Sequence, residues 1–291
     1  MPQISTTGAL ENASREMIST ARYTEEHNAP CMELVEKFTL QKGSDTLILP
    51  KVGQMTISGI SEGQDIVDEE EIGMSTISVT TSEVGAKIIV TDRLLRQNTQ
   101  AIWAIVGRQM GDAMARKKDG DIIDLFSGFS AGHGNTSGTD FTSANATACI
   151  GIAKTDKYGS DLRIVIHPNQ MMYLNSQVST IGLAGNERRP IPAGISADRM
   201  SKFWTGLTLG GVPFFEDGNI SRSSGDDAIG AIFDKGALGV LTSVGMNKEK
   251  QRDASLRASE LVITADYAAF EIDDSRGASL TYDAADPSTV A

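Results

Sequence analysis

Residues 92–126 decide the fold, and they read DRLLRQNTQAIWAIVGRQMGDAMARKKDGDIIDLF. Apolar side chains recur along this stretch at the three- and four-residue spacing of an α-helix. They are Leu95, Ile102, Val106, Met110, Ala113 and Met114, followed by Ile122, Ile123 and Phe126. About thirty-five residues at 1.5 Å each would make a rod of roughly 50 Å. Asp92 is placed to cap the first turn of this predicted helix.

Three glycines interrupt the predicted helix. Gly107 and Gly111 lie four residues apart, on one face. Each costs up to about 1 kcal/mol of helix stability relative to alanine, so they predict a close crossing by another backbone. Gly120 predicts a bend or a break near the end of the helix.

A long β-hairpin is predicted just before the helix, over residues 45–90. Its outgoing strand starts with residues 46–52, and its return strand covers residues 75–90. The apolar face of the return strand changes parity near residues 81–83, which predicts a β-bulge or a strong twist. Isolated hairpins are marginally stable in water. We therefore expect neighbouring subunits to supply contacts that this hairpin lacks.

The tip of the hairpin is acidic. Asp68, Glu69, Glu70 and Glu71 place four carboxylates side by side within residues 61–73. Such a group could bind a hard cation, but calcium-binding loops space their ligands and place a glycine at the turn. The acidic tip is therefore interpreted as a solvated or partner-facing surface.

The remaining segments predict a mixed α+β protein. Residues 1–41 form an N-terminal arm with a short amphipathic helix, and residues 127–139 form a Gly/Ser-rich link. Helices and strands then alternate. The predicted helices cover residues 144–154 and 168–176, and the predicted strands cover residues 162–166, 211–216, 228–233, 256–273 and 278–282.

Charge and composition exclude several protein classes. The chain has 291 residues and a net charge of −12. Its most basic run, residues 116–118, is followed directly by aspartates, so tight nucleic-acid binding is not expected, although loose enclosure remains compatible. No apolar run is long enough for a membrane span or a signal peptide. Cys31 and Cys149 are interpreted as reduced thiols.

The sequence carries no catalytic, cofactor-binding or metal-binding motif, so we do not expect an enzyme. The histidines are His27, His133 and His167. His167 ends a predicted strand, where a structural hydrogen bond is the simplest role. An alternative is a soluble hydrolase or sugar-binding protein that uses the Gly-rich loop around His133.

The order of these segments resembles the major capsid proteins of tailed phages, of the Hong Kong 97 type. The resemblance implies four parts: an N-terminal arm (1–41), an extended β-hairpin loop (42–91), a peripheral domain with the long spine helix (92–127 plus 246–291) and an axial domain (128–245). The segments that carry it are TLILPKV (46–52), EVGAKIIVTD (83–92), the predicted helix (93–126), RIVIHP (163–168), LGGVPFFED (209–217) and residues 256–282.

The resemblance implies a shell protein that assembles through pentamers and hexamers into an icosahedral head around a genome. Portal and scaffolding proteins are expected partners. The resemblance also implies loosely held DNA and allows a decoration protein. The chain would be made in the host cytoplasm and end in the virion. An encapsulin-type nanocompartment shell is the alternative, with the same fold and a protein cargo.

Two features bear on this resemblance. Some members cross-link covalently through a lysine of the extended loop, but residues 53–73 contain no lysine, so no such cross-link is expected. Some members also carry a long scaffolding segment, and here scaffolding is expected to be a separate or already removed piece. By opposite charge, the acidic tip is expected to set register with basic groups of a neighbour. The candidates are Arg188, Arg189, Lys248, Lys250 and Arg252.

Overall fold

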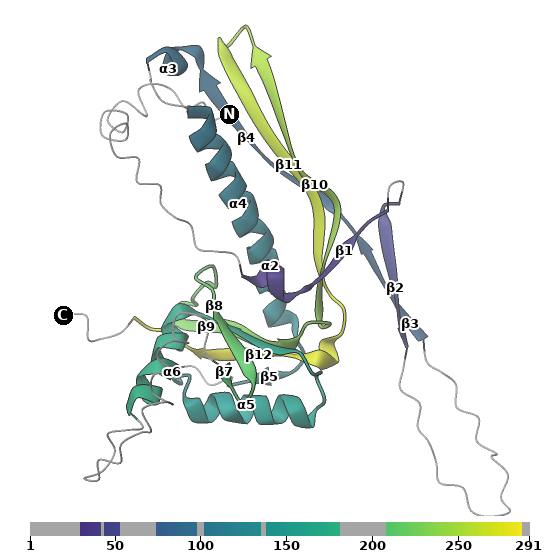
Figure 1. Ribbon diagram of the computed structural model, residues 1–291, viewed down its shortest axis with the longest axis vertical. Coiled ribbons are helices and arrows are strands. Elements are labelled where there is room, and N and C mark those ends of the chain that lie inside the picture. The colour runs from purple at the N-terminus through teal and green to yellow at the C-terminus, as the bar shows by residue number, and fades with distance from the viewer. Residues whose placement is uncertain are drawn as a thin grey trace, which may run out of the picture.

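The computed structural model describes residues 30–41, 44–52, 74–97, 102–134, 138–180 and 208–286. These residues form one four-stranded, one six-stranded and one two-stranded sheet, with a long helix joining the first two (Figure 1). The expected mixed α+β architecture is therefore confirmed. None of the helices in the described part of the chain combines the length and apolar character of a membrane span.

The four-stranded sheet supports the long helix. Its strand order is β1 (Glu36–Thr39), β10 (Leu238–Asp253), β11 (Ala258–Glu271) and β4 (Ser82–Thr91). Helix α4 (Ile102–Asp124) lies along this sheet (Figure 1). The sequence stripe explains the contact, because Met110 and Met114 pack against Ile263, Ala265 and Tyr267 of β11.

The six-stranded sheet is covered on both faces. Its order is β5 (Gly132–His133), β12 (Gly277–Asp283), β9 (Asp227–Asp234), β6 (Leu162–Ile166), β8 (Val212–Glu216) and β7 (Thr208–Leu209). Residues of α5 (Ser143–Thr155) and α6 (Pro168–Thr180) pack on one face. The other face packs against α2 (Cys31–Leu34), the end of α4 and the 3₁₀ turn η1 (Leu125–Gly128).

Strand β6 shows why a short apolar run was a reliable signal. Ile164 and Ile166 point into the core beneath α5 and α6, and Val165 points into the opposite core beneath α4. All three are fully buried. A strand buried on both faces reads as a continuous apolar run rather than an alternating one.

The predicted single helix is corrected in three respects. The structure has a short helix α3 (Asp92–Gln97) and a separate α4 (Ile102–Asp124), with residues 98–101 outside the described part. Thr91, not Asp92, caps α3, since its Oγ1 accepts the Leu94 backbone N–H at 3.4 Å. Gly120 does not break the helix, because α4 continues to Asp124.

The predicted backbone crossing at Gly107 and Gly111 is not found in the described part of the chain. A Cβ atom added at either position would have no neighbour within 4 Å. Their missing side chains therefore make no room for a contact within this subunit, and the helix continues through both.

The hairpin base is a two-stranded sheet of β2 (Thr46–Val52) and β3 (Met74–Thr80), and the tip residues 53–73 lie outside the described part. The parity change has a structural cause: β3 pairs with β2, whereas β4, which begins at Ser82, pairs with β11. The chain thus leaves one sheet and enters another at Thr81.

The base of the hairpin finds apolar contacts within its own subunit. One face of the hairpin carries Leu47, Leu49, Ile77 and Val79, and these pack with Leu241 and Phe270 of the four-stranded sheet. Phe38 and Phe270 add a tilted aromatic contact with ring centroids 5.8 Å apart. The base is therefore attached to its own subunit.

The two large sheets divide the chain differently from the expected boundaries. Strand β12 (Gly277–Asp283) was placed with the spine helix, but it pairs with β9 in the six-stranded sheet. Strand β10 begins at Leu238, before the expected boundary at residue 246, and belongs to the four-stranded sheet. The expected arm helix lies in residues 1–29, outside the described part of the chain.

Candidate functional site

Of the nine predicted assembly residues, the structure describes three. Asp68, Glu69, Glu70, Glu71, Arg188 and Arg189 lie outside the described residues, so their pairing stays a prediction. Lys248, Lys250 and Arg252 lie on β10, and their strand register opposes them to Ile263, Leu261 and Ser259 of β11.

This basic row lies on the α4 side of the four-stranded sheet. Directly opposed residues of an antiparallel pair project from the same face, and Ile263 and Leu261 pack toward α4. Arg252 is engaged within the subunit, because its Nη2 lies 2.8 Å from Asp92 Oδ2 at the start of α3. Lys248 and Lys250 are exposed.

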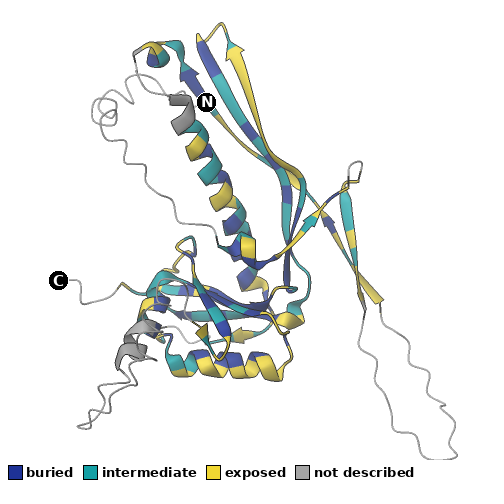
Figure 2. Ribbon diagram, in the orientation of Figure 1, coloured by how far each residue is buried: buried dark blue, intermediate teal, exposed yellow. Residues whose placement is uncertain are grey.

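The far half of β10 is a sheet edge. Strand β1 pairs with β10 only from Gly239 to Thr242. From Ser243 to Asp253, no described strand lies beside the outer edge of β10, and Figure 2 shows this stretch largely in the colour of exposed residues. Val244 and Met246 are 51% and 43% exposed. An open strand edge with apolar side chains is a template for pairing with another chain.

The hairpin base offers a second surface of this kind. Ile48 and Met74 project from the face opposite the packed one, by the two-residue alternation of a strand. They are 62% and 67% exposed, the highest fractions among the large apolar residues of the described chain. The lower part of the hairpin therefore presents apolar side chains to solvent on its free face.

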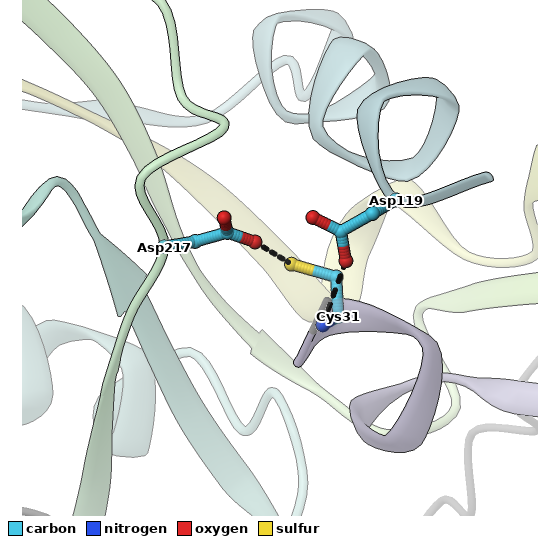
Figure 3. Close-up of side chains that lie close together, drawn as sticks. All are labelled: Cys31, Asp119 and Asp217. Atoms are coloured by element: carbon cyan, nitrogen blue, oxygen red, sulfur yellow. Dashed lines mark hydrogen bonds between the residues drawn. The ribbon is translucent and has the colours of Figure 1, made fainter. Parts of the chain in front are cut away.

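A buried polar cluster joins α2 to the body of the subunit (Figure 3). The backbone N–H of Cys31 donates to Asp119 Oδ1 at 3.0 Å, and its thiol donates to Asp217 Oδ2 with a sulfur–oxygen distance of 3.4 Å. The amide group of Asn219 donates to Asp119 Oδ2 at 2.9 Å, and its backbone N–H donates to Asp217 Oδ1 at 2.8 Å. Cys31, Asp119 and Asp217 are all fully buried.

Burial and mutual repulsion set the protonation of this cluster. Burial and the neighbouring Asp217 raise the pKa of Asp119 from 3.8 to about 7, against the lowering effect of its bonds from Asn219 and Cys31. Burial and both carboxyl groups raise the pKa of the Cys31 thiol, so it stays protonated. The sulfur and one oxygen of each carboxyl lie within 4.8 Å of one another, a spacing that could suit a metal ion. The donors and acceptors already satisfy one another, so the geometry favours a proton-sharing cluster.

No local pattern of the sequence indicated this cluster. Cys31 is 88 positions from Asp119 and 186 positions from Asp217. A local signal was Asp119 itself, a charged residue three and four positions before the apolar Ile122 and Ile123.

The region of the Gly-rich loop contains a shallow pocket. His133 lies on β5, which pairs with β12, rather than in an irregular loop. Its Nε2 is buried and has no hydrogen-bond partner in the described part of the chain. The pocket measures about 420 Å³ and is lined by residues that include Thr139, Asn145, Cys149 and Tyr282.

The described residues that line this pocket do not bring a nucleophile and a base together. The Cys149 thiol hydrogen-bonds the Tyr282 hydroxyl at 3.5 Å instead of a histidine. Burial raises the pKa of Cys149, which disfavours the reactive thiolate. The predicted structural role of His167 is confirmed, since its backbone N–H donates to Gln170 Oε1 at 3.1 Å and its Nδ1 accepts the Asn169 N–H at 3.1 Å.

Comparison with known proteins gives matches at the level of structure. No family model and no curated protein sequence matches the chain. The chain is similar to the head structure of Helicobacter pylori bacteriophage KHP40, with a TM-score of 0.67 and 11% identity over 98% of each chain. It is similar to the capsid of a native GTA particle, with a TM-score of 0.67 and 13% identity over 98% of this chain and 95% of that one. The capsid of Cyanophage P-SCSP1u matches with a TM-score of 0.61 and 16% identity over 87% of each chain.

Proposed function

We propose that this chain, which has the Hong Kong 97-type fold of tailed-phage major capsid proteins, is itself the shell protein of a tailed double-stranded DNA phage. The observation that carries the proposal is the likeness to phage head and capsid structures over up to 98% of the chain. The role would be structural rather than enzymatic. The finished protein would reside in the virion after synthesis in the host cytoplasm.

The exposed surfaces support a self-assembling role. The open edge of β10 and the free face of the hairpin base carry Val244, Met246, Ile48 and Met74 in exposed positions. Burying apolar surface between subunits would contribute roughly 25 cal/mol per Å². Many repeated contacts of this kind would hold pentamers and hexamers together around loosely held DNA. Portal, scaffolding and decoration proteins would be further partners.

Charge would set the register between neighbours. Residues 53–73 contain acidic side chains but no lysine, arginine or histidine. Any positively charged partner of the acidic tip therefore comes from outside this segment. Lys248 and Lys250 are exposed on β10, whereas Arg252 already pairs with Asp92. Lys248, Lys250 and Arg252 stay the candidates on β10, with Arg188 and Arg189 as the other predicted pair.

Electron microscopy of the purified full chain, with size-exclusion chromatography at raised concentration, tests the shell function. Closed shells or rings of five and six subunits are the expected result. A lone monomer at every salt and protein concentration would overturn the proposal. Nucleic acid inside shells from infected cells would favour a phage head, whereas a co-purifying protein cargo would favour a nanocompartment.

A charge-reversal experiment tests the register hypothesis. The variant Lys248→Glu/Lys250→Glu should assemble at a lower yield than the wild type, because like charges would face the acidic tip. Adding Glu69→Lys, Glu70→Lys and Glu71→Lys to the same chain should restore the yield. Lys157→Glu, at an exposed position near the end of α5, is the control. An unchanged yield in the first variant would refute the pairing.

A further inference from the structure

Helix α2 is the point at which the arm meets the body of the subunit. It has four residues, Cys31–Leu34, which is too short for a helix to be stable without tertiary contacts. At its far end, Arg163 Nη1 donates to the Leu34 carbonyl at 2.7 Å. At its near end, both polar groups of Cys31 bond to the carboxyl groups of Asp119 and Asp217. The attachment at Leu34 thus uses the permanently charged Arg163, whereas the attachment at Cys31 uses two carboxyl groups whose charge changes with pH.

The carboxyl groups at the near end form an unusual pair. Asp119 extends from α4 and Asp217 follows β8, and neither is exposed to solvent (Figure 3). Two neighbouring carboxylates in a buried site cannot both ionise without a large cost, so such a pair retains one proton between them. One oxygen of each carboxyl and the Cys31 sulfur lie within 4.8 Å of one another, which places the two carboxyl groups close enough to interact electrostatically.

Three cations of the surrounding elements have other partners. On α4, Lys118 lies over the Tyr267 ring at 5.1 Å from its centroid, and Lys117 pairs with Asp121. On β6, the second guanidinium nitrogen of Arg163 bonds to Asp161 at 2.7 Å. On α2, Glu33 is exposed and pairs with Lys37. The groups that act on Asp119 are Asp217, Asn219 and the Cys31 backbone N–H.

We propose that Cys31, Asp119 and Asp217 form a proton-operated latch: the proton shared by the two carboxyl groups keeps α2 docked on α4, and its loss loosens the docking. Without the proton, two buried negative charges face each other across the Cys31 side chain. Undocking of α2 lets water reach both carboxylates and relieves the repulsion.

The direction and size of the effect follow from linkage. In the docked state the pKa of Asp119 is about 7, against its ordinary value of 3.8. The docked state therefore holds a proton that the undocked state releases between these two values. Docking is strongest below about pH 4 and weakens as the pH rises through 7. Between pH 5.5 and pH 8, the undocked fraction should rise about thirty-fold.

Thiol labelling of the full chain measures this opening directly. A brief pulse of iodoacetamide, followed by mass spectrometry, gives the modified fractions of Cys31 and Cys149 in the same molecules. Cys149 corrects for the reactivity of thiols with pH, because it is also buried but bonds to Tyr282 and not to a carboxyl group. The Cys31-to-Cys149 ratio should rise about thirty-fold from pH 5.5 to pH 8.

The variant Asp119→Asn separates the latch from other causes. Asparagine keeps an oxygen for the Cys31 N–H but loses the acceptor of the Asn219 amide. Because asparagine does not titrate, the labelling ratio should become independent of pH. A wild-type ratio that changes less than two-fold, or a variant that retains the full pH dependence, would overturn the proposal. If the variant does not fold, hydrogen exchange of the Cys31–Leu34 amides in the wild type gives the same test, with the buried α5 amide of Ile150 as reference.

The latch has a consequence for assembly. Because α2 connects residues 1–29 to the rest of the chain, its undocking would release this connection from α4 as pH rises. This consequence rests on the proposed shell function, but the latch does not. If the labelling ratio responds to pH but the chain never assembles, the latch is retained and the shell function is rejected. If the chain assembles but the ratio does not respond to pH, the shell function is retained and the latch is rejected.

Discussion

Replacing Phe126 with alanine should uncouple the long helix from the six-stranded sheet. Phe126 follows α4 in the turn η1 and is fully buried. Its ring lies 5.7 Å from that of Phe233 on β9, at an interplanar angle of 36°. Replacing a buried phenylalanine of this kind by alanine costs about 3–5 kcal/mol in total, and loss of the aromatic pair is part of that cost. We expect a loss of about 4 kcal/mol in the free energy of unfolding.

Urea unfolding of the full chain, followed by far-ultraviolet circular dichroism, measures this loss. With a slope of about 3 kcal/mol per M, the midpoint should fall by about 1.3 M. Ile152→Ala is the matched control, because Ile152 lies on α5 with 42% of its surface exposed; it should change the stability by less than about 0.5 kcal/mol. A loss below 1 kcal/mol in the Phe126 variant would refute the packing of the α4 end against β9.

Other changes test local features of the same framework. Gly230→Ala should destabilise the protein by about 1–3 kcal/mol, because a Cβ there would lie 2.4 Å from the Val165 carbonyl oxygen; Gly151→Ala, with nothing within 4 Å of its new Cβ, should stabilise α5 by up to about 1 kcal/mol. Equal melting temperatures for the two variants would contradict this contrast. Thr142→Ala should cost about 1 kcal/mol, since the Thr142 hydroxyl accepts the Asn145 N–H and caps α5. Thr147→Ala, which removes a hydroxyl bonded within the helix, should not lower the thermal midpoint, and the thermal midpoints of both variants check this pair.

Local periodicity was sufficient for the elements whose packing is uniform along their length. The stripe of α4 and the apolar run of β6 indicated which side chains face the core; β6 forms as expected, and α4 forms over Ile102–Asp124, a shorter span than predicted. The change of parity in the return strand also corresponds to a feature of the structure, the change of pairing partner between β3 and β4. Its cause, the passage from β3 to β4 at Thr81, depends on which strand each half pairs with and could not be read locally.

The far half of β10 shows the opposite case. From Val244 to Arg252 every residue is exposed, so neither face leaves an apolar pattern. Backbone pairing with β11 makes this stretch a strand, and that pairing depends on residues after the turn at Ala254 to Arg257. The exposure that concealed the strand from the sequence is also what makes its edge a candidate assembly surface.

The sequence by itself determined the architecture, the acidic tip without cations and the absence of a catalytic motif, because these features are recorded in the spacing and type of neighbouring residues. The tertiary structure alone decided which strands share a sheet and that Cys31, Asp119 and Asp217 meet in one buried cluster. The thiol and the two carboxyl groups are far apart in the sequence, and no local pattern links them. Their proximity, and with it the raised pKa of Asp119, arises only where α2, α4 and the end of β8 pack together and exclude water.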